Sequence, residues 1–161
     1  MQNGQTAKAV EVLRGERARA TDHVVPYILA VALLRSGIEA QSPAALEAVD
    51  ALRASVRARS DFAPARSELG RLLLKRDELD AAIAELEKAA ELDPDGTSAL
   101  YTLSLAYRRK GEREKAQELL ARVSRLNAQE RGDDSDGELR RAVVRIVREG
   151  KPKPAPPASQ P

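Results

Sequence analysis

The apolar positions of this chain follow a repeated order. Residues 62–94 read FAPARSELGRLLLKRDELDAAIAELEKAAELDP, and residues 96–128 read GTSALYTLSLAYRRKGEREKAQELLARVSRLNA, so the two stretches align without gaps at a spacing of 34 residues. Each stretch places small residues (Gly70 and Ala82, Ser104 and Ala116) where two helices would approach closely. Larger apolar residues one turn away would fill the space between them. Each stretch therefore predicts a hairpin of two helices.

The same order occurs earlier in the chain with a longer turn. Leu29, Ala30 and Leu33 stand 40 residues before their counterparts in residues 62–94, whereas Ala48 and Leu52 stand 34 residues before theirs. The difference predicts an insertion of six residues within positions 36–43. Ser42 and Pro43, an N-cap hydroxyl followed by proline at the first helical position, predict that the second helix begins there.

The start of the chain also follows the pattern. Residues 4–13 (GQTAKAVEVL) parallel residues 111–120 (GEREKAQELL), which predicts a second helix without its first helix over residues 1–20. This parallel indicates the C-terminal part of a longer protein. The isolated glycines are expected in turns, and they are Gly4, Gly15, Gly37 and Gly111.

The pattern changes after residue 128. Residues 129–150 are predicted to form a polar linker and then a helix whose apolar face comprises Leu139, Ala142, Val143, Ile146 and Val147. Such a helix would cap the last exposed face of a repeat array. Residues 151–161 (KPKPAPPASQP) are predicted to be a disordered tail.

The repeat resembles the tetratricopeptide repeat. Leu69-Gly70, Ala82 and Pro94 match its signature, although Arg66 stands at the usual opening aromatic and Leu86 at the usual Phe. The resemblance implies an all-α fold: a right-handed α-solenoid of antiparallel helical hairpins, closed by the C-terminal capping helix. Its predicted parts are residues 1–20, hairpins at 21–61, 62–95 and 96–128, the linker and cap at 129–150, and the tail at 151–161.

In this family the first helix of each hairpin lines a concave groove, so the resemblance implies a set of residues that face a ligand. If Leu69, Gly70 and Leu73 pack inward, the helical period places the groove residues on the opposite side. These are Tyr27, Val31, Leu34, Arg35, Ser67, Arg71, Leu74, Lys75, Tyr101, Leu105, Arg108 and Arg109. The set is basic, partly apolar and without an acid. We call it the first-helix face.

The composition of this face predicts a protein-interaction scaffold that binds a peptide or protein segment with acidic residues, because arginine binds carboxylates through two hydrogen bonds. A merely solvated face is the alternative interpretation. The Lys and Asn of the family's carboxylate clamp are missing, since their places hold Tyr27 and Val31, Ser67 and Arg71, and Tyr101 and Leu105. Two further alternatives stay open: a structural or self-associating arm of a larger protein, and a single-stranded RNA-binding repeat.

Composition narrows the function further. The chain has no Cys and one histidine, His23, which is expected at the surface of a helix start. No pair of a nucleophile and a base can be identified, so no enzymatic activity, metal or cofactor is predicted. A net charge of +2 and an aromatic content of 2% disfavour nucleic acid. The chain has no apolar run of about 20 residues, the length that spans a bilayer, so membrane insertion is not predicted. A soluble protein of the bacterial cytoplasm or periplasm is expected.

Overall fold

We describe a computed structural model of the chain, which covers residues 2–17, 22–129 and 131. Every regular element among these residues is a helix. The chain divides into two compact units, Met1–Ser124 and Arg125–Pro161. In the second unit, residues 125–129 and 131 are helical. The predicted capping helix and the Pro-rich tail lie outside the described residues.

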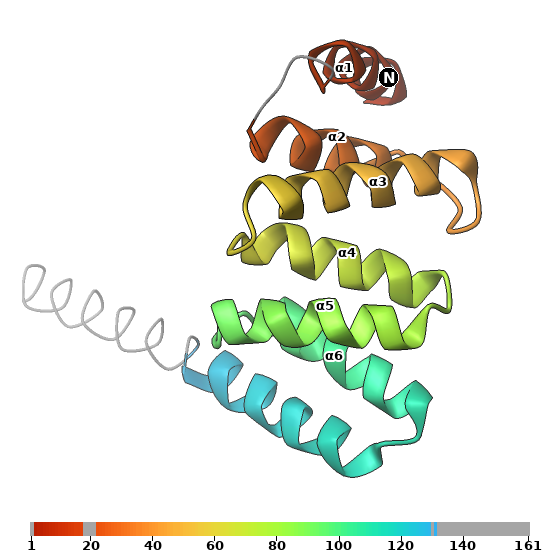
Figure 1. Cartoon of the computed structure of the whole chain (residues 1–161). Coiled ribbons are helices and arrows are strands. Elements are labelled where there is room, and N and C mark those ends of the chain that lie inside the picture. Colours follow the sequence, from red (N-terminus) through yellow and green to blue (C-terminus); the bar gives the residue numbers. More distant parts are fainter. Residues whose placement is uncertain (1, 18–21, 130, 132–161) are drawn as a thin grey trace, which may run out of the picture. The chain divides into compact units, whose positions relative to one another are not determined.

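The first unit is a stack of antiparallel helices (Figure 1). Each helix packs against the next one in the chain, and α4 also contacts α6. In Figure 1, α3 lies in front of α2 and α5 lies in front of α6. Helical backbone resumes at residue 113 and continues to the end of the unit. The preceding helices are α1 (Gln2–Arg17), α2 (Val24–Arg35), α3 (Pro43–Ala58), α4 (Ala63–Lys75), α5 (Leu79–Leu92) and α6 (Thr97–Lys110).

Local sequence signals account for several helix ends. The Ser42 hydroxyl accepts a hydrogen bond of 3.2 Å from the Ala45 amide, and α3 begins at Pro43, which confirms the predicted start. Gly111 ends α6 with a φ of 92°, a left-handed conformation that glycine adopts without steric cost.

The prediction of turns at Gly4 and Gly15 is wrong, because both lie inside α1. One glycine costs a helix about 1 kcal/mol relative to alanine, which good helix formers around it can offset.

Close packing of α4 against α5 depends on the absence of a side chain at Gly70. A Cβ added there would lie 2.5 Å from Leu86 Cγ and 3.1 Å from the Ala82 carbonyl oxygen. Leu86 and Ala82 are both fully buried. The small residue that marks the repeat in the sequence is therefore required by the contact between these two helices.

Arg66 occupies a buried position near the start of α4, where the family usually has an aromatic residue. Its Nε donates to the Ser60 carbonyl at 2.8 Å, and its Nη1 donates to Glu85 Oε2 at 2.7 Å. The Arg66 side chain is 10% exposed and the Glu85 side chain 23% exposed. A hydrogen-bonded ion pair thus joins α4 to the preceding turn and to α5.

His23 has a packing role at the start of α2. Its ring lies edge-on against Phe62 with the ring centres 4.7 Å apart, and its carbonyl accepts a 2.7 Å hydrogen bond from the buried Ser55 hydroxyl. These contacts join the start of α2 to α3 and to the residue before α4. The histidine is half-buried rather than free at the surface.

Tyr107 on α6 is buried, and its hydroxyl donates to the carboxylate of Glu87 on α5. The Lys115 ammonium lies 5.0 Å from the centre of its ring. Burial, reinforced by the Glu87 carboxylate, raises the pKa of Tyr107 to about 12. Both causes oppose the ionised phenolate, so the fold stabilises the protonated phenol.

We expect this phenol to make stability depend on alkaline pH. An unperturbed tyrosine has a pKa of 10.0, so the contribution of Tyr107 to stability is complete below pH 10 and is lost as pH rises toward about 12. Ultraviolet titration of the folded protein should show a last phenolate step that is missing in Tyr107→Phe. In urea that step should merge with the others. Ionisation of all three tyrosines together in the folded protein would contradict the prediction.

Candidate functional site

Two hydrogen bonds along one edge of the unit join the turn after α2 to the end of α4, and α4 to the last turn of α6. Arg76 Nη1 donates to the carbonyl of Ala40, in the turn after α2, at 2.9 Å. Arg109 Nη1, on α6, donates to the Leu74 carbonyl of α4 at 2.9 Å. The C-terminal ends of the first helices therefore share one edge of the unit.

Five exposed cations lie in these last turns. Lys110 is paired with Asp80, and we call the other four the cationic edge: Arg35, Lys75, Arg108 and Arg109. Cations at a helix C-terminus also stabilise the helix dipole, so their presence alone does not require a ligand. None of the four forms an ion pair with a carboxylate of the described residues. The edge therefore presents to solvent cations that no ion pair with a described carboxylate neutralises.

The other predicted groove residues differ in exposure. Tyr101 is 49% exposed, whereas Leu74 is 5% exposed and belongs to the core. The prediction that Leu74 faces ligand is wrong, because α6 packs against α4 and covers that side of the helix. The remaining members of the first-helix face are half-buried, and they are Tyr27, Val31, Leu34, Ser67, Arg71 and Leu105.

An acidic residue adjoins the predicted set, which itself contains no acid. Glu68 lies one residue after Ser67, and its Oε2 accepts hydrogen bonds from both Nε and Nη2 of Arg71. Residues three apart on a helix are neighbours on its surface, which permits this pair. Because Glu68 compensates the charge of Arg71, Arg71 is a weaker candidate for binding an acidic partner than the cationic edge.

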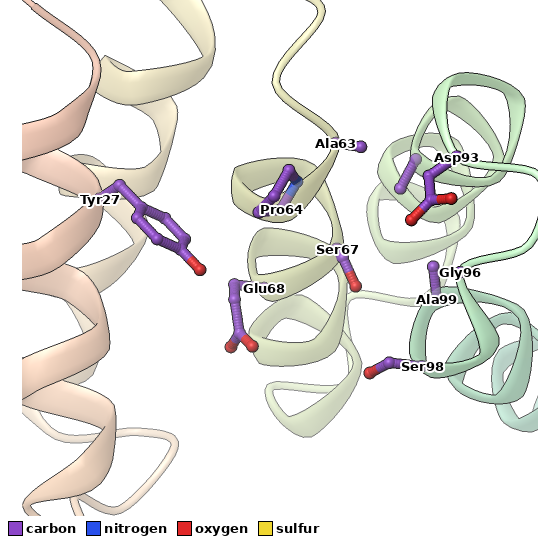
Figure 2. A pocket seen from close by; sticks show the side chains of 10 residues that line it. Tyr27, Ala63, Pro64, Ser67, Glu68, Asp93, Gly96, Ser98 and Ala99 are labelled. Carbon is purple, nitrogen blue, oxygen red and sulfur yellow. The ribbon is translucent and has the colours of Figure 1, made fainter. Parts of the chain in front are cut away.

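A pocket of about 210 Å³ opens at the opposite ends of these helices (Figure 2). Tyr27 projects from α2 with its hydroxyl directed toward Glu68 of α4. Its ring packs edge-on against Phe62, with ring centres 5.1 Å apart. Burial and then the charge of Glu68 raise the pKa of Tyr27, although Arg35 and Arg71 oppose this shift. The pocket is lined by Tyr27, Ala63, Pro64, Ser67, Glu68, Ala89, Asp93, Gly96, Ser98 and Ala99.

An apolar stripe on α2 was not among the residues predicted from the sequence. Val24 is 41% exposed and Ile28 is 44% exposed, and both share a side of the helix with Val31 and Arg35. The signal was present in the sequence VVPYILAVALLR, whose one charged residue is Arg35. A helix that is apolar on all sides is normally covered on all sides. This side of α2 is left open by the described residues.

Two kinds of site are absent from the described part of the chain. Among the residues that the structure describes, no three His, Asp or Glu side chains are grouped so that they could bind a metal ion. Over the same residues, no helix combines the length and the hydropathy needed to span a bilayer.

The stacked helical hairpins define an α-solenoid, a class whose repeats each contact their neighbours and present extended binding surfaces. Residues 78–134 match the sequence model of the family described as "Tetratricopeptide repeat". Over these residues the chain carries a tetratricopeptide repeat. The predicted all-α solenoid and the family resemblance are thus confirmed.

Solved structures support the same fold. The crystal structure of MamA has a TM-score of 0.70 and 26% identity, over 80% of this chain and 72% of that chain. YrrB, described as "a TPR protein with an unusual peptide-binding site", has a TM-score of 0.66 and 23% identity, over 76% of this chain and 61% of that chain. MamA from Desulfovibrio magneticus RS-1 has a TM-score of 0.51 and 21% identity, over 80% and 89%. None of the curated proteins matches the sequence.

Proposed function

We propose that this chain is a protein-interaction scaffold that binds an acidic segment of a partner at its first-helix face. The observation that carries the proposal is the cationic edge: three different helices contribute exposed cations to one edge, and none of the four is ion-paired with a described carboxylate. Guanidinium groups bind carboxylates with two parallel hydrogen bonds, and an ammonium adds a compact charge. The peptide-binding site named for YrrB agrees with this use of the fold.

Single-stranded RNA is the competing ligand for the same cations. Proteins that bind single strands combine a cationic groove with aromatic rings on which bases stack. On the first-helix face, Tyr101 is an exposed ring, whereas Tyr27 is half-buried and packed against Phe62. A peptide therefore fits the face better than RNA does.

The test reverses charge on the edge. The triple variant Lys75→Glu, Arg108→Glu, Arg109→Glu should lose at least about 100-fold in affinity for acidic peptides, since each hydrogen bond to a charged group contributes about 1.5–3 kcal/mol. Peptides selected from a random 12-residue library on the immobilised wild-type chain serve as probes. Binding is measured by fluorescence anisotropy.

A matched control makes the same change of charge elsewhere. Arg53 on α3, Lys88 on α5 and Arg113 are also exposed and form no ion pair with a described residue, but they lie on the second helices of the hairpins. Their reversal to Glu should leave peptide binding and helicity as in the wild type. Equal loss in both variants would refute the cationic edge as the site, and selective loss of oligo(U) binding instead would favour RNA.

A further inference from the structure

The exposed sides of the first helices differ in polarity from one helix end to the other, and this difference is concentrated on α2. At the end where the first helices begin, α2 exposes Val24 and Ile28 to solvent. At the end where they finish, it carries Arg35. The counterparts of Val24 and Ile28, by the spacings of 40 and 34 residues, are Pro64 and Glu68 on α4 and Ser98 and Thr102 on α6. The exposed aliphatic stripe is therefore confined to one of these three helices.

Charges reinforce this division of the face. The pocket beside Tyr27 is lined by two carboxylates, Glu68 and Asp93, and by no cation. Both hydrogen bonds from Arg71 go to Oε2 of Glu68, so Oε1 accepts none from the described residues. Glu68 is paired with Arg71, so Asp93 is the carboxylate of this pocket without an ion pair to a described residue. An acidic side chain is therefore attracted more strongly to the cationic edge than to this end. This difference favours one placement of a partner with carboxylates.

We propose, on the basis of the proposed function, that the face binds an extended segment whose apolar side chain packs on Val24 and Ile28 while its carboxylates lie at the cationic edge. The helical rise of about 1.5 Å per residue places Arg35 about 10 Å beyond Ile28 along α2. An extended segment covers that distance in about three residues, at roughly 3.3 Å each. The partner therefore carries a large apolar residue about three positions from an acidic residue.

The partner's apolar side chain should contribute to affinity by packing on α2. A leucine side chain laid on two exposed aliphatic residues removes apolar surface of both molecules from water. Ile28→Ser withdraws part of that surface without disturbing the core, because Ile28 is 44% exposed. We expect about a tenfold loss of affinity for a leucine-containing peptide from this variant.

The experiment uses fluorescein-labelled peptides that contain Leu-Gly-Ser-Glu-Glu within a Gly-Ser background, and a series in which the Leu-to-Glu spacing runs from one to seven. Affinity should be greatest at a spacing of three. Replacing Leu by Gly should weaken binding to the wild type about tenfold and should have little further effect on Ile28→Ser. Leu46→Ser is the matched control: Leu46 is 49% exposed on α3, and its replacement should leave all affinities unchanged.

The two proposals can fail separately. If affinity is independent of spacing, or if Ile28→Ser binds the leucine peptide as well as the wild type does, the apolar anchor is refuted while an acidic-segment scaffold stands. If the triple charge reversal at Lys75, Arg108 and Arg109 leaves peptide binding intact, the proposed function itself is refuted.

Discussion

Arg66→Ala should lower the free energy of unfolding by about 3 kcal/mol, because it removes one partner of a largely buried ion pair. The substitution leaves the Glu85 carboxylate and the Ser60 carbonyl without their donors. Glu85 is 23% exposed on its side chain, so water can reach it in part, and we expect the lower end of the usual range for such losses. Urea unfolding followed by circular dichroism measures the change.

Two variants test the cause of that loss. Lys110→Ala breaks an exposed ion pair, in which the Lys110 side chain is 43% exposed and the Asp80 side chain 86% exposed. This substitution should change the unfolding midpoint little. The double variant Arg66→Leu, Glu85→Leu replaces the pair by apolar residues and should recover most of the stability lost in Arg66→Ala. A double variant no more stable than Arg66→Ala would show that the position matters for another reason.

Gly70→Ala should destabilise the protein by about 1–2 kcal/mol, although alanine is the better helix former by about 1 kcal/mol. The added Cβ would lie 2.5 Å from Leu86 Cγ, and Leu86 is fully buried and cannot move away freely. Steric cost therefore exceeds the gain in helix propensity. Thermal and urea unfolding both report the sign of the change.

The same substitution at Gly15 is the control. Gly15 lies in α1, and a Cβ there would meet no heavy atom within 4 Å, so Gly15→Ala should raise helicity and stability slightly. In a Leu86→Ala background, the loss caused by Gly70→Ala should shrink, because the two Leu86 atoms that the Cβ would meet are gone and only the Ala82 carbonyl oxygen remains. An undiminished loss there would contradict a clash with Leu86 as the cause.

Several features of the first unit could be predicted from local sequence. Ser42 and Pro43 mark a helix start wherever they meet an apolar helical pattern, because the cap hydrogen bond is made within one turn. The small residue at Gly70, set among larger apolar residues at helical spacing, already indicates that two helices approach closely there. The departure of Arg66 from the usual aromatic was visible in the sequence. Its partner Glu85, 19 residues away, was not.

The twelve site residues stay a prediction, and the structure gives their exposure. The helical period assigns directions around each first helix, and eleven of the twelve residues are exposed or half-buried. It cannot tell which directions another helix covers. Leu74 is buried because α6 lies against α4, and Glu68 reaches Arg71 because its side chain extends along the helix surface.

The sequence by itself determined an all-α chain of tetratricopeptide hairpins, because helical periodicity and small residues at fixed spacing are local properties of the chain. The tertiary structure alone decided which of those helix sides stay open. It brought the last turns of α2, α4 and α6 to one edge through the bonds of Arg76 and Arg109 to carbonyls about 35 residues away. It also left Ile28 exposed at the other end of α2. Such placements depend on how helices pack across turns, which a period along one helix does not encode.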